Sequence, residues 1–167
     1  MKKHSLFRTL VACKVCGISN RQLGYWIDRQ VVEPSFCVYT PRGAKPTYLF
    51  SMDDMARIML VRDLRGAGIS LQKIRAAFAR CKMYESPPIS GEWLISNGRD
   101  LYMRTTDPDK FECLTGPAQG QFVFGFAIGH SRNLVRKRLE KFGFRPFTSK
   151  HKLIPWDQKS GSSAPSL

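Results

Sequence analysis

The apolar residues in the first half of the chain recur at the spacing of amphipathic helices. We expect a first helix over about residues 5–15 and a second over about residues 20–29. A third helix should begin after Ser51, and a fourth after Ser70, because serine is a good helix cap. The apolar positions expected on the inner faces of the first, third and fourth helices are Phe7, Leu10, Val11, Val15, Met55, Ile58, Met59, Leu64, Ile74, Ala77, Phe78 and Cys81.

Residues 17–34 carry the strongest local signals of the chain. Ser19 can accept a hydrogen bond from a backbone N–H of the second helix, and Gln22 can reach back to it, which forms a capping box. Trp26 could pack against the following hairpin or under its own helix, and we favour the core because large aromatic side chains are mostly buried. The side chains expected to point outward are Arg21, Tyr25 and Arg29, opposite Leu23 and Ile27.

An extended hairpin follows the second helix. Residues 31–34 end that helix with two valines and a proline, and the extended stretch continues to Leu49. The turn at its tip, over residues 41–46, carries Arg42 and Lys45. Two helices, a cationic hairpin and two more helices, in that order, predict a winged helix-turn-helix, in which a short helix enters a DNA groove.

The apolar pattern changes period in the second half of the chain. Pro87 and Pro88 stop any helix at a boundary over residues 82–88, and beyond it apolar and polar residues alternate as in strands. Asn97-Gly98 is typical of a type I′ hairpin turn. The expected elements are a hairpin over residues 93–104, strands over residues 111–114 and 121–128, and a helix over about residues 131–142. Beyond residue 148 the chain is polar, and we expect disorder.

The composition strengthens the expectation of a polyanionic partner. The chain of 167 residues has a formal net charge of +14, and 43% of its residues are hydrophobic, which is enough for a folded core. The charge is concentrated in residues 1–80 and 131–167, while residues 81–130 are slightly acidic. High charge can also serve solubility alone. Nucleic acid is the commonest polyanion that a basic domain of this size binds.

The cysteines and the remaining residue types point away from several classes of protein. Five irregularly spaced cysteines favour reduced thiols in a cytoplasm over a disulfide framework. Cys13 and Cys16 form an isolated Cys-x-x-Cys pair, which is a weak zinc signal, so we expect no metal and no cofactor. No membrane span is expected, and Arg8 interrupts the stretch that resembles a signal sequence. We find no catalytic constellation, so we expect a protein that is not an enzyme.

Residues 6–82 resemble the MerR family of bacterial transcription regulators. The segments that carry the resemblance are Cys16–Ser19, Arg21–Trp26, Val31-Val32, Pro34-Ser35, Tyr48–Ser51, Asp54, Leu64–Leu71 and Ile74-Arg75. Residues 92–128 also resemble a small β module that follows this domain in some such regulators. The resemblance implies a homodimer on a partly palindromic site with a bent or untwisted promoter, and makes RNA polymerase a candidate partner.

The chain departs from the family pattern at three places. Gly24 stands where the family commonly has arginine, and residues 46–48 replace the usual Gly-Tyr-Arg of the wing, so Arg42 and Lys45 must supply the wing's charge. Members usually dimerise through a long helix after the fourth helix, but Pro87 and Pro88 leave no room for one. How this chain would dimerise is therefore open.

Together these observations predict an α+β protein in three parts. The parts are a winged helix-turn-helix domain over residues 1–82, a β module with a C-terminal helix over residues 83–147 that could dimerise or bind an effector, and a flexible tail over residues 148–167. The predicted function is sequence-specific binding of double-stranded DNA by a cytoplasmic, nucleoid-associated transcription regulator. The residues expected to contact DNA are Ser19, Asn20, Arg21, Gln22, Tyr25, Arg29, Arg42 and Lys45, with a second surface formed by Arg132, Arg136, Lys137 and Arg138.

Two other functions remain open. An architectural or excisionase-like recombination accessory protein shares the winged fold and would bind DNA with little preference among sequences. An RNA-binding module would also fit the charge, and competition between RNA and duplex DNA at equal salt would separate it from the other two.

Overall fold

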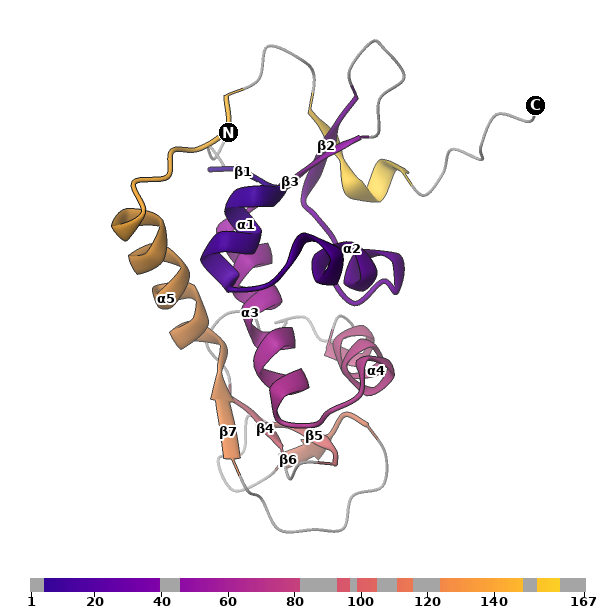
Figure 1. Cartoon of the computed structure of the whole chain (residues 1–167). Coiled ribbons are helices and arrows are strands. Elements are labelled where there is room, and N and C mark those ends of the chain that lie inside the picture. Colours follow the sequence, from indigo (N-terminus) through magenta and orange to yellow (C-terminus); the bar gives the residue numbers. More distant parts are fainter. Residues whose placement is uncertain are drawn as a thin grey trace, which may run out of the picture.

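The fold combines five α-helices with two antiparallel four-stranded sheets, as the predicted α+β class requires (Figure 1). The computed structural model describes residues 5–39, 46–81, 93–96, 99–104, 111–115, 124–148 and 153–159, and the element counts refer to these residues. No helix in these ranges is both long and apolar enough to cross a membrane.

The four predicted helices of the first half are present. They are α1 (Thr9–Cys16), α2 (Asn20–Asp28), α3 (Met52–Gly66) and α4 (Leu71–Cys81). The inner face predicted for α3 is confirmed, because Met55, Ile58, Met59 and Leu64 are all fully buried. Ile74 and Ala77 of α4 are fully buried as well.

The first helix begins later than the sequence predicts, and its buried face differs. Phe7 and Arg8 form strand β1, in which Phe7 pairs with Phe50 and is 3% exposed. Leu10, which was expected to face inward, is 75% exposed. The residues of α1 that are buried are Ala12, Cys13, Val15 and Cys16. The periodicity that included Phe7 and Leu10 was misleading because Phe7 is buried as part of a strand.

The N-terminal sheet contains the predicted hairpin. Strand β2 (Phe36–Val38) pairs with β3 (Thr47–Phe50), and the sheet order is β1-β3-β2-β8. Residues 40–45, at the tip of the hairpin, lie outside the described residues. The predicted positions of Arg42 and Lys45 therefore stay predictions.

The second sheet and the last helix form one continuous unit. The strands are β4 (Trp93–Ser96), β5 (Leu101–Arg104), β6 (Phe111–Cys113) and β7 (Phe124–Ala127), in the order β6-β5-β4-β7. The predicted hairpin is confirmed, since Ser96 pairs with Leu101. Helix α5 (Ile128–Lys141) follows β7 directly and begins three residues before the predicted start. The Asn97-Gly98 turn lies outside the described residues.

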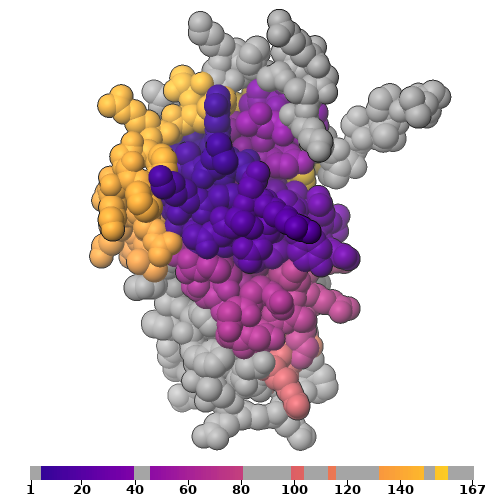
Figure 2. All heavy atoms as spheres, viewed as in Figure 1, coloured from indigo at the N-terminus to yellow at the C-terminus, as the bar shows by residue number. Residues whose placement is uncertain are grey.

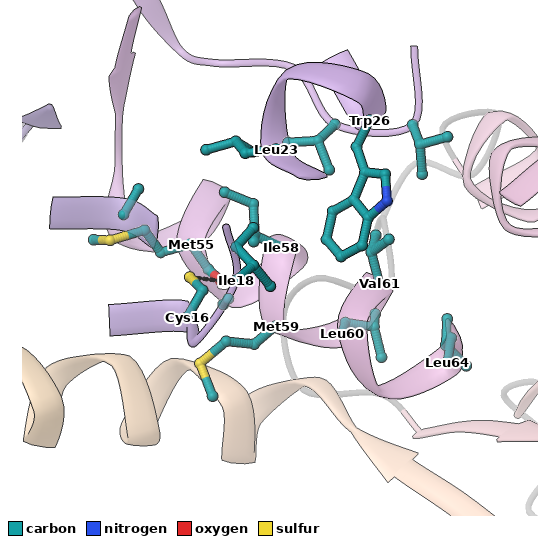
Figure 3. Close-up of a cluster of buried hydrophobic side chains, with 14 of the residues drawn as sticks. Cys16, Ile18, Leu23, Trp26, Met55, Ile58, Met59, Leu60, Val61 and Leu64 are labelled. Atoms are coloured by element: carbon teal, nitrogen blue, oxygen red, sulfur yellow. Dashed lines mark hydrogen bonds between the residues drawn. The ribbon is translucent and has the colours of Figure 1, made fainter. Parts of the chain in front are cut away.

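A single hydrophobic cluster joins the first half of the chain to the second. Most of its members from the first half belong to α1, α2 and α3, and Figure 3 labels several of them, including Trp26 and Val61. The second half contributes Leu101, Met103, Leu114, Val135 and Leu139 to the same cluster. Helix α5 lies along α3 and also contacts α1 (Figure 1). The division into domains over residues 1–82 and 83–147 stays a prediction, but the two parts share a core.

The prediction of a flexible tail is wrong for residues 153–159. Strand β8 (Ile154–Pro155) pairs with β2, and the 3-10 helix η2 (Trp156–Lys159) follows it (Figure 1). The rings of Trp156 and Tyr48 meet edge to face, with centroids 5.5 Å apart. The tail as a whole is polar, but residues 153–156 form a short apolar run. This run is held by pairing with β2, by the contact with Tyr48, and by a hydrogen bond from the Trp156 N–H to the Ser35 carbonyl over 3.1 Å.

Candidate nucleic-acid interface

The turn between α1 and α2 depends on a glycine. Gly17 has φ 69° and ψ 41°, a left-handed conformation that glycine adopts without steric cost. Its N–H donates to the carbonyl of Cys13 over 2.9 Å, and the N–H of Ile18 donates to the same oxygen over 3.1 Å. The turn therefore ends α1 sharply and delivers Ser19 to the start of α2.

The predicted capping box at the start of α2 is confirmed. The backbone N–H of Gln22 donates to the Ser19 hydroxyl over 3.1 Å, and the N–H of Ser19 donates to the Gln22 side-chain oxygen over 3.4 Å. These two bonds satisfy backbone donors that the first turn of a helix leaves without intrahelical partners. Gln22 is exposed, and its side-chain oxygen also accepts the hydrogen bond of the cap.

Helix α2 has a sharply divided surface. Its inner side chains, Leu23, Trp26 and Ile27, are buried against the core, and the expectation of a core position for Trp26 is confirmed at 3% exposure. Figure 3 shows the Trp26 indole directed toward Val61 of α3. The exposed residues of the turn and helix include every predicted contact there: Ser19, Asn20, Arg21, Gln22, Tyr25 and Arg29.

The exposed face of α2 is cationic and aromatic. The guanidinium of Arg29 lies 5.2 Å from the centroid of the Tyr25 ring, a cation–π distance. Tyr25 is 48% exposed, so part of this residue remains accessible to a ligand. Buried apolar contacts hold this helix in place while its polar side chains stay accessible.

The start of the hairpin is anchored to α3 by the carboxylate of Asp54, a role that its sequence neighbours do not reveal. One oxygen of Asp54 accepts hydrogen bonds from the Ser35 backbone N–H (3.0 Å), the Ser35 hydroxyl (2.6 Å) and the Ser51 N–H (2.8 Å). The Asp54 N–H in turn donates to the Ser51 hydroxyl over 3.1 Å, so Ser51 and Asp54 form a second capping box. The Ser-x-x-Asp spacing of Ser51 and Asp54 is enough to predict the capping box. The contact with Ser35 joins residues that are distant in the sequence, so no local pattern indicates it.

The four cations predicted as a second surface separate into two groups. Arg132 pairs with Asp53 of α3, and Arg138 donates to the backbone carbonyl of Val15 over 2.6 Å, so both are engaged within the molecule. Arg136 and Lys137 are exposed. Helical spacing places Arg132 and Arg138 on the same side of α5 as the buried Val135 and Leu139, while Arg136 and Lys137 lie on another side. Their role in DNA binding stays a prediction.

The Cys13–Cys16 pair is buried in the core. Burial raises the pKa of the Cys16 thiol to about 12; the cations Arg62 and Arg138 lower this pKa, and the neighbouring Cys13 raises it. The Cys16 thiol lies 3.4 Å from the carbonyl oxygen of Met55 (Figure 3). Within the described part of the chain, no three His, Cys, Asp or Glu side chains gather as a metal site would require.

The geometry defines a class of protein: a helix-turn-helix with a capped, outward-facing second helix and an adjoining β hairpin. Comparison with known proteins agrees with this class. Residues 11–81 match the model of the MerR HTH family regulatory protein, so this segment is similar to the domain of that family. The resemblance seen in the sequence is confirmed over these residues.

Curated relatives extend the similarity beyond that domain. Two proteins named as uncharacterized HTH-type transcriptional regulators, from Mycobacterium bovis and Mycobacterium tuberculosis, are each 32% identical to this chain over 130 residues. The match covers 77% of this chain and 56% of each relative. The chain thus spans little more than half the length of the curated relatives it matches.

Proposed function

We propose that this protein binds double-stranded DNA through α2 and regulates transcription. In this proposal, α2 enters the major groove, and the β2–β3 hairpin follows the neighbouring phosphate backbone with Arg42 and Lys45. In this proposal Asn20 and Arg21 contact base edges and phosphates, and Tyr25 and Arg29 contact phosphates. The family model that residues 11–81 match and the names of the relatives support a regulator.

One observation carries the proposal more than any other. The first turn of α2 is fixed by a capping box and by buried Trp26 and Leu23, while Arg21 stays exposed. A rigid helix with an exposed cation in its first turn costs little conformational entropy on binding. An exposed cation on a mobile segment would not have this advantage.

The experiment is a salt titration of binding to duplexes that the wild-type protein selects from a random 30-base-pair pool. Arg21→Ala should weaken binding and reduce the slope of log affinity against log salt by about 1, because one phosphate contact is lost. Arg75→Ala is the matched control: it removes the same charge from an exposed position on α4 and should leave affinity and slope unchanged. Unchanged affinity and slope for Arg21→Ala would refute the role of α2.

We further propose that two copies bind a partly palindromic site, and that exposed Arg136 and Lys137 add phosphate contacts from α5. Helix α5 packs on α3 of its own chain, so it is not a long free helix of the kind that usually joins two members of the family. Analytical ultracentrifugation with and without a selected duplex tests this directly. Two protein copies on one duplex support the dimer, and a single copy on every selected duplex excludes it.

A further inference from the structure

We propose that Arg138 is a positioning residue for α2: together with Arg62 it holds the C-terminal carbonyls of α1 and so fixes the turn that aims the recognition helix. This inference rests on the proposed function, because it concerns how the same DNA-binding helix is oriented. It assigns to a residue of α5, far along the chain, a role in DNA recognition without a DNA contact.

Two guanidinium groups meet at the end of α1. Arg138 donates from Nη1 to the carbonyl of Val15 over 2.6 Å, and Arg62 donates from Nη1 to the carbonyl of Cys16 over 2.6 Å. A β-carbon built at Gly17 would lie 3.4 Å from Nη1 of Arg62 and 3.9 Å from Nη1 of Arg138. The two cations therefore flank the turn residue itself.

The electrostatics of a helix end explain why these contacts are favourable. The last carbonyls of a helix lack intrahelical partners and carry the negative end of the helix dipole. A cationic donor that reaches such a carbonyl makes a charge-assisted hydrogen bond, stronger than a neutral one. Because Val15 and Cys16 immediately precede the turn, their orientation sets where α2 begins.

The two arginines come from different parts of the molecule. Arg62 is fixed on α3, since its Nε and Nη2 also donate to Asp63 over 2.8 and 2.7 Å. Arg138 is half-buried and projects from α5, whose Val135 and Leu139 are buried in the shared core. In Figure 2 the orange-to-yellow atoms of α5 and the residues after it lie against the indigo atoms of α1.

This arrangement links the second sheet to the turn. Strand β7 passes into α5 without an intervening residue, so a shift of that strand moves the helix that carries Arg138. The link runs from β7 through α5 and Arg138 to α1, and then through Gly17 to α2. Arg138 thereby connects the second sheet with the DNA-binding helix through a short series of direct contacts.

The test compares Arg138→Ala and Arg138→Lys with wild type on the selected duplexes. Arg138→Ala should weaken affinity about 10-fold, as expected for loss of a hydrogen bond with a charged partner, without changing the salt slope, because no phosphate contact is lost. Arg138→Lys should restore part of the affinity, since the ammonium can still donate. Arg75→Ala should again match wild type. Unchanged affinity for Arg138→Ala overturns the inference, and a slope reduced by about 1 overturns it in favour of direct contact with DNA.

Hydrogen exchange provides a readout independent of DNA. Amides of residues 17–23 should exchange faster in Arg138→Ala than in wild type, while amides in the middle of α3 keep their protection. If Arg138→Ala does not fold, the same two measurements on Arg138→Lys decide the question, with smaller changes in the same directions expected. If wild type selects no duplex, the proposed function fails, and exchange alone then confirms or rejects the positioning role.

Discussion

Replacement of Asp54 by alanine should be among the most destabilising single changes in the described part of the chain. Asp54 is 8% exposed and accepts three hydrogen bonds, two from Ser35 and one from Ser51. Asp54→Ala leaves these donors without their acceptor in a largely buried site. Hydrogen bonds to a charged group contribute about 1.5–3 kcal/mol each, but bonds that share one acceptor are not additive. We expect a loss of about 3–4 kcal/mol, a large part of the stability of a small protein.

Asp53 is the matched control for this prediction. It is also a carboxylate in the first turn of α3, so both residues interact favourably with the helix dipole. Its side chain is 49% exposed and pairs with Arg132, whose side chain is 47% exposed. Pairs exposed to that degree contribute about 0–1 kcal/mol, so Asp53→Ala should cost about 1 kcal/mol or less. The difference between the two variants isolates the contacts with Ser35 and Ser51.

Urea denaturation followed by circular dichroism measures the difference. The midpoint should fall much further for Asp54→Ala than for Asp53→Ala, with similar m-values. Asp54→Asn should lie between them, because the amide oxygen can still accept while the charge is lost. Equal losses for Asp53→Ala and Asp54→Ala would contradict this prediction, since the hydrogen bonds to Asp54 would then add nothing to the interaction with the helix dipole.

Three further predictions follow from the structure. Gly24→Ala should stabilise the protein by about 0.5–1 kcal/mol, seen as a higher melting temperature, because a β-carbon at this helical position meets nothing within 4 Å; an unchanged or lower melting temperature would contradict this. Burial raises the pKa of Cys16 from 9.0 to about 12, so the folded state keeps the proton that the unfolded chain releases. The stability that the buried Cys16 thiol contributes is complete below pH 9 and is lost as the pH rises toward 12. The urea midpoint of wild type should therefore fall over that range, and that of Cys16→Ala should fall less steeply. Equal slopes for the two proteins would contradict this prediction. Trp156→Ala should lower the melting temperature by several degrees through loss of the Tyr48 contact, and no change would show that residues 153–159 do not stabilise the fold.

The features that the sequence predicted correctly depend on residues close together in the chain. Ser19 and Gln22 are three residues apart, and their reciprocal hydrogen bonds follow from helix geometry alone. The buried face of α3 follows equally from helical periodicity. Such signals are readable because the interacting groups lie within one or two helical turns.

The features that the sequence did not predict depend on distant partners. Apolar spacing predicts Phe7 in a helix, but Phe7 pairs in a strand with Phe50, which is 43 residues away and so leaves no local signal. Arg138 was assigned to an outer face, and its acceptor, Val15, is 123 residues away. Strand β8 is only two residues long, and its short apolar run, residues 153–156, is ordered by pairing with β2, which lies far away in the sequence. Local pattern carries no information about which distant group a side chain meets.

Selection of DNA sequences is the sharpest test of the proposal that the exposed face of α2 reads bases. Wild type, Asn20→Ala, Arg21→Ala and Arg75→Ala would each select duplexes from the same random pool at fixed salt. Wild type and Arg75→Ala should select a defined motif, and Asn20→Ala and Arg21→Ala should show a relaxed preference at specific positions of that motif. A wild type that selects no motif, or variants of Asn20 and Arg21 that select the same motif as wild type, would contradict this proposal.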